Sequence, residues 1–164
     1  MAVSPAVRRY YAERIFAHMG RDKAPANFRP LGVPAHGMST VEGCRGGGKN
    51  ILEVQVLVEQ GRLADLRASC GLCNPAMYVG VDVVLEWARG QQVAALLALD
   101  PLAMAALEPL YARLGGPGKP DDAREKMQYA LVAVQAALRK ALGQAAVATP
   151  GIEPPTDRDW AAGS

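Results

Sequence analysis

The sequence predicts an α+β fold in which helices pack on one face of an antiparallel sheet of about three strands. Over residues 51–69, polar and apolar residues alternate, which is the two-residue period of strands that bury one face. Over residues 5–19 and 122–143, apolar residues instead recur at helical spacing. The expected order is therefore a helix, an irregular region, a hairpin, and then three or four helices.

The first helix is expected over residues 5–19, and a long connection rich in Pro and Gly follows it. That connection has room for one short strand near residues 37–42. The helix keeps its apolar positions four residues apart and can turn its charged positions to water; the apolar ones are Val7, Tyr11, Ile15 and Met19, and the charged ones are Arg8, Arg9 and Glu13.

Residues 51–69 are expected to form a β-hairpin with one buried face. Gly61 supplies the turn, and the second strand runs over about residues 62–69. The side chains expected on the buried face are Leu52, Val54, Val56 and Val58 on the first strand, and Ala64, Leu66 and Ala68 on the second.

The next helix is expected to begin after Asn74, a residue type favoured at the N-cap, with Pro75 suited to its first turn. Gly90 can end it. Almost every position between is apolar, so this helix should be largely buried. Three charged residues form one narrow stripe at helical spacing, which we interpret as a solvated or partner-facing edge: Asp82, Glu86 and Arg89.

One or two short helices are expected over residues 92–114, with Asp100 and Pro101 marking a start. Asp121 or Asp122 can cap the last helix, because Asp is favoured at that position. The apolar face expected for this helix consists of Met127, Leu131, Val134 and Leu138.

Length and composition indicate a soluble globular protein. The chain has 164 residues, of which 50% are hydrophobic, and a net charge of +2. We expect one domain over residues 1–143 and a disordered, Pro-rich tail over residues 144–164. No basic block suggests nucleic acid, and no apolar run is long enough for a membrane helix or a signal peptide. A cytoplasmic location is the default expectation.

The three cysteines are the candidate residues for metal or redox chemistry. Cys44 lies in "GCRGGGKN", and Cys70 and Cys73 are separated by two residues in "ASCGLCNPAM". In a reducing compartment, three cysteines are not a disulfide framework, and close spacing favours metal or redox chemistry. They could also be buried small residues, since free cysteine is often found in cores.

The position of each cysteine bears on these alternatives. Cys44 stands among glycines, where there is little side-chain mass to build a core. Cys70 and Cys73 straddle a strand end and a helix start, where backbone N–H groups stabilise thiolates. A redox dithiol gives Cys44 no role, and here a hairpin precedes the motif rather than a βαβ unit. A metal site uses all three thiols and leaves a fourth position for Asp122, His36 or an external ligand.

In the order of its elements and the placement of its cysteines, the chain resembles the IscU/NifU-type iron–sulfur cluster assembly scaffold proteins. The resemblance spans about residues 8–143. It is carried by "RRYYAERIFAHM", "GGGKNILEVQVLVEQGRLADLRASCGLC", "VVLEWARGQ" and "GKPDDAREKMQYALVAVQAALRKAL". It implies the IscU/NifU N-terminal type of fold, a small antiparallel sheet with helices on one face.

Only some of the family's cluster-binding positions have a matching residue in this chain. The family has a Cys-Gly-Asp just before the first hairpin strand, where this chain has residues 48–50, and the thiol is found four residues upstream as Cys44. The second family cysteine matches Cys73, and Cys70 is an addition. The family's His-Cys pair follows a Lys at the start of the last helix. Here Lys119 is followed by Pro120 and two carboxylates, Asp121 and Asp122.

The resemblance implies a protein that binds iron or a [2Fe–2S] cluster through Cys44, Cys70 and Cys73, with Asp122 as a further metal ligand. Such a protein would be a scaffold or delivery protein rather than an enzyme. Its expected partners are a cysteine desulfurase and recipient apo-proteins, and a homodimer could share one cluster. The alternatives are an interaction or regulatory module of the same fold, which could bind zinc, and a dithiol reductase that uses Cys70 and Cys73.

Overall fold

The computed structural model describes residues 5–18, 24–42, 51–70, 75–103, 107–110 and 122–143. Most of these residues belong to short helices in the N-terminal part, three strands, and two long helices. Residues 107–110 are also helical. The elements are α1 (Pro5–Tyr10), η1 (Tyr11–Ile15), η2 (Phe16–His18), η3 (Ala26–Phe28), β1 (Gly37–Glu42), β2 (Ile51–Glu59), β3 (Arg62–Cys70), α2 (Pro75–Ala88), α3 (Val93–Leu97) and α5 (Asp122–Ala141).

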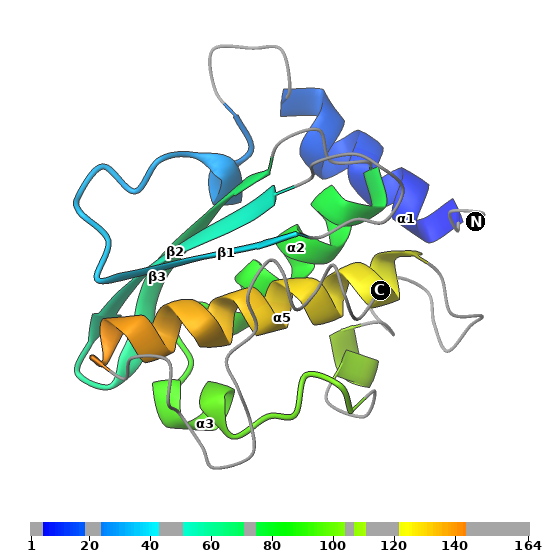
Figure 1. Ribbon diagram of the computed structural model, residues 1–164. Coiled ribbons are helices and arrows are strands. Elements are labelled where there is room, and N and C mark those ends of the chain that lie inside the picture. Colours follow the sequence, from blue (N-terminus) through cyan, green and yellow to red (C-terminus); the bar gives the residue numbers. More distant parts are fainter. Residues whose placement is uncertain are drawn as a thin grey trace.

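The three strands form one antiparallel sheet in the order β1-β2-β3, with α2 and α5 packed against one face (Figure 1). The side chains of β2 alternate between buried and less buried positions, because every second one faces α2 and α5. Leu52, Val54 and Val56 are fully buried, whereas Ile51 is exposed. The expected α+β class, the hairpin and the short strand at 37–42 are confirmed.

A β-bulge changes which side chains of β3 reach the core. Leu57 pairs with Asp65, whereas Val58 pairs with Leu63, so Ala64 has no partner across the ladder. Leu63 is consequently fully buried. Near the turn, the buried face of β3 therefore contains Leu63 and not the expected Ala64. The expected burial of Leu66 and Ala68 is confirmed.

The N-terminal segment is helical along all of its described residues, as the spacing of its apolar positions predicts, but its geometry changes midway. α1 is an α-helix, η1 is a π-helix and η2 is a 3₁₀ turn. Val7 and Ile15 are buried, and Tyr11 is half-buried. Met19 lies outside the described residues.

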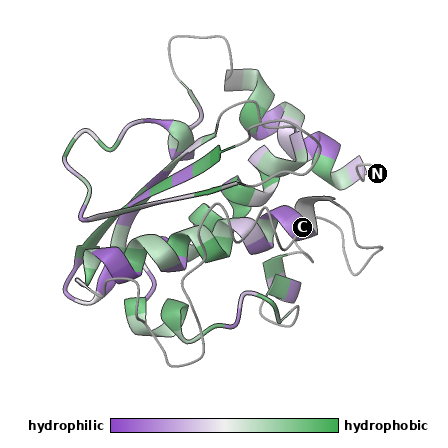
Figure 2. Cartoon of the chain, in the orientation of Figure 1, coloured by the Kyte–Doolittle hydropathy of each residue, from purple (hydrophilic) through white to green (hydrophobic). Residues whose placement is uncertain are grey.

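The two long helices supply most of the core opposite the sheet. α2 ends before Gly90, whose φ of +85° suits glycine. The apolar residues expected on α5 are fully buried, and its observed end is two residues before the expected one. Figure 2 shows α2 as an almost continuously apolar helix. The expected helix start at Asp100 is instead a turn, in which Leu102 N–H bonds to the Asp100 carboxylate at 2.9 Å.

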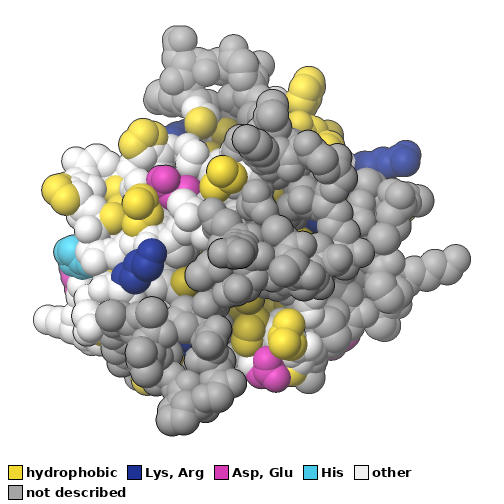
Figure 3. Space-filling view, in the orientation of Figure 1, with side chains coloured by type: hydrophobic (Ala, Val, Ile, Leu, Met, Phe, Trp, Pro, Cys, Tyr) yellow, Lys and Arg dark blue, Asp and Glu magenta, His cyan; other side chains and the backbone are white. Residues whose placement is uncertain are grey.

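Apolar side chains that reach the surface are dispersed. In the face seen in Figure 3, those of the described residues are interspersed with polar and charged ones. No described helix is long and apolar enough to cross a membrane. The expected Asn74 cap, the loop around 115–121 and the tail 144–164 lie outside the described residues. The large apolar side chains with the most exposure are Phe16, Val33, Met38, Ile51, Leu102 and Leu142.

Candidate metal centre at one end of the sheet

The strands next to both cysteine-bearing segments, 43–50 and 70–74, end at the same end of the sheet, here called the cysteine end. Glu42 pairs with Ile51 at the last position of β1, and Cys70 pairs with Leu52 at the last position of β3. The segment 43–50, which contains Cys44, connects β1 to β2 at this end. The opposite end, here called the turn end, contains the hairpin turn between β2 and β3.

Both long helices also start at the cysteine end. α2 begins five residues after Cys70, and past its last residue Gly90 N–H bonds to Leu63 O at 2.7 Å near the turn end. α5 reaches Gly37, near the turn end, with its last turns. The two helices therefore run in the same direction, away from the cysteine end (Figure 1).

This arrangement favours negative charge at the cysteine end. The first-turn N–H groups of a helix are unsatisfied within the helix and carry a partial positive charge, which stabilises thiolates and other anions. The chain thus connects its cysteine-bearing segments at the end of the molecule where two helix N-termini lie. Cys44 and Cys73 themselves fall outside the described residues.

Cys70 is the one predicted ligand thiol that the structure describes. It is half-buried and packs against the core, and it is disulfide-bonded. Tyr78 O–H lies 3.5 Å from Cys70 O, and the Tyr78 ring packs edge-on against Phe28 with centroids 5.1 Å apart. Burial, with a smaller effect of Tyr11, raises the pKa of Tyr78. The aromatic side chains of Tyr78 and Phe28 therefore lie beside the last residue of β3.

The structure removes His36 from the candidate ligands of this site. Val58 N–H donates to His36 Nδ1 at 2.9 Å, and His36 N–H donates to Val56 O at 2.9 Å. Val56 and Leu52 are four residues apart on β2, about 13 Å. His36 thus lies toward the turn end, far from Cys70, so the two do not share a metal site as expected.

The remaining predicted ligand, Asp122, is the first residue of α5, which places its backbone at the same end of the molecule as Cys70. Its side chain and all of Asp121 lie outside the described part of the chain. Within that part, no group of three His, Cys, Asp or Glu side chains could hold a metal ion. The proposed ligand set of three cysteines and Asp122 therefore remains a prediction.

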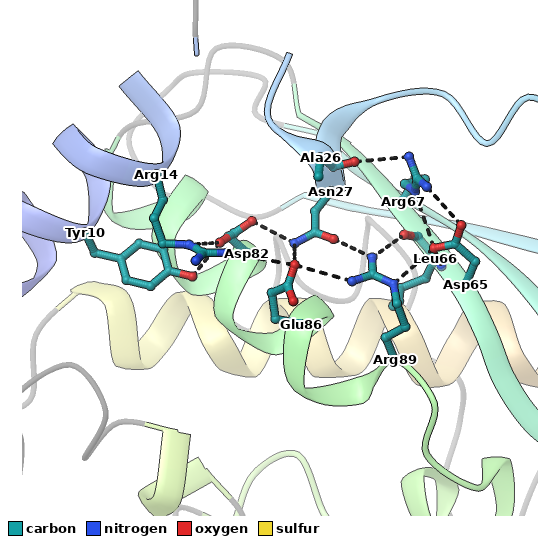
Figure 4. A network of polar contacts seen from close by, with 10 residues as sticks. All are labelled: Tyr10, Arg14, Ala26, Asn27, Asp65, Leu66, Arg67, Asp82, Glu86 and Arg89. Atoms are coloured by element: carbon teal, nitrogen blue, oxygen red, sulfur yellow. Dashed lines mark hydrogen bonds and ion pairs between the residues drawn. The ribbon is translucent and has the colours of Figure 1, made fainter. Parts of the chain in front are cut away.

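A second polar cluster, absent from the sequence-based expectations, surrounds Asp82 on α2 (Figure 4). Asp82 is only 3% exposed. Tyr10 O–H donates to its Oδ2 at 2.5 Å, Asn27 Nδ2 donates to its Oδ1 at 2.7 Å, and Arg14 Nε lies 3.5 Å from Oδ2. The stripe expected to be a solvated edge is therefore buried at Asp82, because α1, η1 and η3 cover it.

The same network continues to the free edge of β3. Arg89 donates to Asn27 Oδ1, to Leu66 O at 3.1 Å and to Asp65 Oδ1 at 3.1 Å. Arg67 also bonds to Asp65, at 2.9 Å. Asp65 is partly buried, which by itself raises its pKa, but the hydrogen bonds from Arg67, Leu66 N–H and Arg89 lower it overall.

This network connects five elements, α1, η1, η3, β3 and α2. Tyr10 and Asp82 are separated by 72 residues, and Asn27 and Asp82 by 55. Burial and the Asp82 carboxylate both raise the pKa of Tyr10, so the phenol stays protonated and donates. The helical spacing of the α2 stripe was the only sequence signal, and it gave no indication of Tyr10 or Asn27.

These features define a small α+β domain with cysteine-bearing connections at one end of its sheet. No protein-family model matches the sequence, and no curated protein matches it. Among solved structures, the chain is similar to the crystal structure of a nitrogen-fixing NifU-like protein (N-terminal) from Brucella abortus. The two share 17% sequence identity with a TM-score of 0.41, over 85% of this chain and 89% of that chain.

Proposed function

We propose that this protein binds iron or a [2Fe–2S] cluster at the cysteine end and delivers it to a recipient protein. The observation that carries the proposal is the convergence at this end: Cys70 ends β3 beside the β1–β2 connection that contains Cys44, and α2 and α5 both start there. Thiolates are the usual ligands of iron–sulfur clusters, and helix N-termini favour their charged form. The order of elements shared with the IscU/NifU-type scaffolds supports the same function.

The chemistry of this end suits a cargo that is bound and released. Three thiolates leave one position open on a four-coordinate metal, which Asp122, an external ligand or a second chain can occupy. An oxygen ligand on a cluster is weaker than thiolate. The proposed site is therefore one of binding and transfer, and the protein is not an enzyme that turns over a small molecule.

The proposed partners follow from this function. A cysteine desulfurase would supply sulfur, and recipient apo-proteins would accept the cluster. A homodimer that shares one cluster between two chains would complete a thiolate set without an oxygen ligand. A cytoplasmic location suits thiols that must be kept reduced.

The test is anaerobic reconstitution of the reduced full chain with iron and sulfide. Iron, zinc and acid-labile sulfide are measured together with the visible absorbance spectrum, for the wild type and for Cys44→Ser, Cys70→Ser and Cys73→Ser. We expect bound iron in the wild type and a loss in each variant, with Cys70→Ser losing as much as Cys73→Ser. Absence of any metal after reconstitution would contradict the proposal and favour an interaction or regulatory module. Zinc alone would favour the zinc-binding form of that module.

The disulfide at Cys70 favours one second candidate function, thiol–disulfide exchange. The hairpin before the motif differs from the βαβ context of redox dithiols. An insulin-reduction assay separates the two functions. Robust activity that needs Cys70 and Cys73 but not Cys44 would support the reductase, and its absence together with bound iron would support the scaffold.

A further inference from the structure

The N-terminal segment, which comprises residues 5–18, is held on α2 by polar side chains. Tyr10 O–H donates to the Asp82 carboxylate at 2.5 Å, and Arg14 lies 3.5 Å from the same carboxylate and 3.9 Å from that of Glu86 (Figure 4). Arg14 also lies over the Tyr10 ring, 5.3 Å from its centroid. These two side chains thus connect the segment to the charged stripe of α2.

Apolar burial contributes less to this attachment than to that of α5. Val7 and Ile15 are the only fully buried side chains of residues 5–17, whereas the face of α5 toward the core is a continuous set of buried apolar residues. The free energy of burial is roughly proportional to the apolar area removed from water. Separation of the segment from α2 therefore exposes less apolar surface than separation of α5 would.

The carboxylates that the segment would leave behind on α2 keep other partners. Asn27 Nδ2 donates to Asp82 at 2.7 Å and to Glu86 at 3.0 Å, and Arg89 donates to Glu86 at 3.4 Å. Water can replace Tyr10 and Arg14, because the stripe becomes exposed when the segment leaves. Opening therefore leaves no unpaired charge buried, which is the main penalty for breaking a buried ion pair.

The backbone of the segment is fitted to its docked position. Two pairs of docking side chains are four residues apart, Tyr10 with Arg14 and Tyr11 with Ile15. In a regular α-helix each such step turns by about 40°, so the second member of each pair would rotate away from α2. The π-helix η1 has a wider turn, in which Phe16 N–H bonds to Tyr11 O, five residues back. This rare geometry keeps both pairs on α2, and it therefore belongs to the docked state.

The docked segment covers the aromatic side chain next to Cys70. The Tyr11 ring packs against the Tyr78 ring with centroids 6.4 Å apart, and Tyr78 O–H lies 3.5 Å from Cys70 O. Figure 1 shows the segment across the first half of α2, the half nearer the cysteine end. Its position therefore decides whether this side of the cysteine end is exposed.

We propose that the N-terminal segment is a lid, which opens away from α2 as a unit while the sheet, α2 and α5 stay folded. Opening breaks the contacts of Tyr10 and Arg14 with Asp82 and uncovers Tyr78 beside Cys70. The purpose of the lid rests on the proposed function, since a recipient protein must approach the cysteine end to accept its cargo. The closed state would retain the cargo, and the open state would admit the recipient.

The test is hydrogen exchange, measured by mass spectrometry on the reduced, metal-free full chain at low concentrations of urea. Exchange through a local opening depends weakly on urea because little surface is exposed, whereas exchange through global unfolding depends strongly on it. We expect the weak dependence for the amides of residues 9–18 and the strong one for those of β2. A common rate and a common urea dependence would overturn the inference, because the segment would then open only when the whole chain unfolds.

A pair of matched variants tests the contact at Asp82. Tyr10→Phe removes one hydrogen bond of the docked segment and should accelerate exchange of its amides about tenfold, as for a bond to a charged acceptor. The control is Tyr129→Phe, which removes a phenol hydrogen bond to Glu125 on α5, 2.9 Å long. It should leave exchange of the segment unchanged, even where it accelerates that of β2. Arg14→Gln replaces Tyr10→Phe if that variant does not fold, with the same acceleration expected.

Unchanged exchange of the segment in Tyr10→Phe, or an equal acceleration in Tyr129→Phe, would also overturn the inference. This outcome is separate from the proposed function, which is decided by the iron content of the reconstituted wild type. Bound iron without local opening would leave the function standing and remove the lid.

Discussion

Asp82 is a buried carboxylate whose partners come from η3 and from both parts of the N-terminal helical segment. Asp82→Ala would leave Tyr10 without its acceptor, Asn27 with only Glu86 as acceptor, and Arg14 without its nearer carboxylate. We expect it to lower the free energy of unfolding by about 3 kcal/mol, as for the loss of a buried charged partner. Urea denaturation followed by circular dichroism measures the change.

Two variants make this prediction specific. Asp82→Asn keeps one acceptor oxygen, so its loss should be smaller. Glu86→Gln, on the same stripe but with a side chain 42% exposed, should change stability by less than about 1 kcal/mol. Equal effects of Asp82→Ala and Glu86→Gln would contradict the account of the buried network.

Asp65 predicts a dependence of stability on pH. Its pKa is lowered in the folded state by Arg67, Leu66 N–H and Arg89, against the opposing effect of burial. A lowered pKa stabilises the fold above the unfolded value of about 4, and this contribution is lost as the pH falls through the folded value.

The wild type should consequently be more stable than Asp65→Asn at pH 7. The difference should begin to shrink near pH 4, the unfolded value, and be lost as the pH falls through the lower folded pKa. Chemical denaturation at several pH values tests this. Glu59→Gln, an exposed carboxylate at the turn end, is the control and should show little difference at any pH. A difference between the wild type and Asp65→Asn that persists undiminished to pH 2 would exclude the carboxylate as its cause.

At the scale of elements, the contact between β1 and α5 depends on Gly37. A Cβ at this residue would lie 2.1 Å from Ala137 O and 2.6 Å from Ala141 N, both of them backbone atoms. Gly37→Ala therefore requires the helix and the strand to separate, and we expect a loss of about 3 kcal/mol or more.

The control for Gly37→Ala is Gly32→Ala. Gly32 has a φ of +80°, and a Cβ added there would meet no atom within 4 Å. Its substitution should cost only the backbone strain, about 1 kcal/mol. If thermal unfolding shows the two variants to be equally destabilised, the close approach of α5 to β1 is not what Gly37 serves.

The elements that the sequence predicted are those encoded by local periodicity. The alternation of β2 and the helical spacing of α5 are properties of neighbouring residues, so both elements appear where expected. The bulge at Leu57 and Val58 arises from how β2 pairs with β3, and no residue type marks it. No residue type in the sequence indicates the π-helix η1 either. Tyr10, which precedes η1, and Arg14, which lies in it, both contact Asp82.

The candidate site was predictable to a similar extent. The residue types and the strand–CxxC–helix context identified Cys70 and Cys73 as a feature at the end of a strand, and the structure places Cys70 there. His36 was misplaced because sequence proximity to Cys44 says nothing about which end of the sheet a connection occupies.

At the scale of the whole molecule, the oxidation state of Cys70 should control metal binding. A disulfide-bonded sulfur is not a thiolate ligand, so the form in which Cys70 is bonded lacks one of the three proposed ligands. Protein purified in air without reductant should bind less iron on reconstitution than the same protein treated first with a phosphine reductant. Equal iron binding by the two forms would show that Cys70 is not a ligand.

The central claim is that the three thiols form a single site, since the strands and both long helices bring their segments to one end. Titration of the reduced, anaerobic protein with Co²⁺ tests it most directly, because the thiolate-to-cobalt charge-transfer band grows with the number of thiolate ligands. The account predicts saturation at one Co²⁺ per site, with a band that falls by about one third in each of Cys44→Ser, Cys70→Ser and Cys73→Ser. A band that does not saturate, or one that is unaffected by Cys44→Ser, would contradict it.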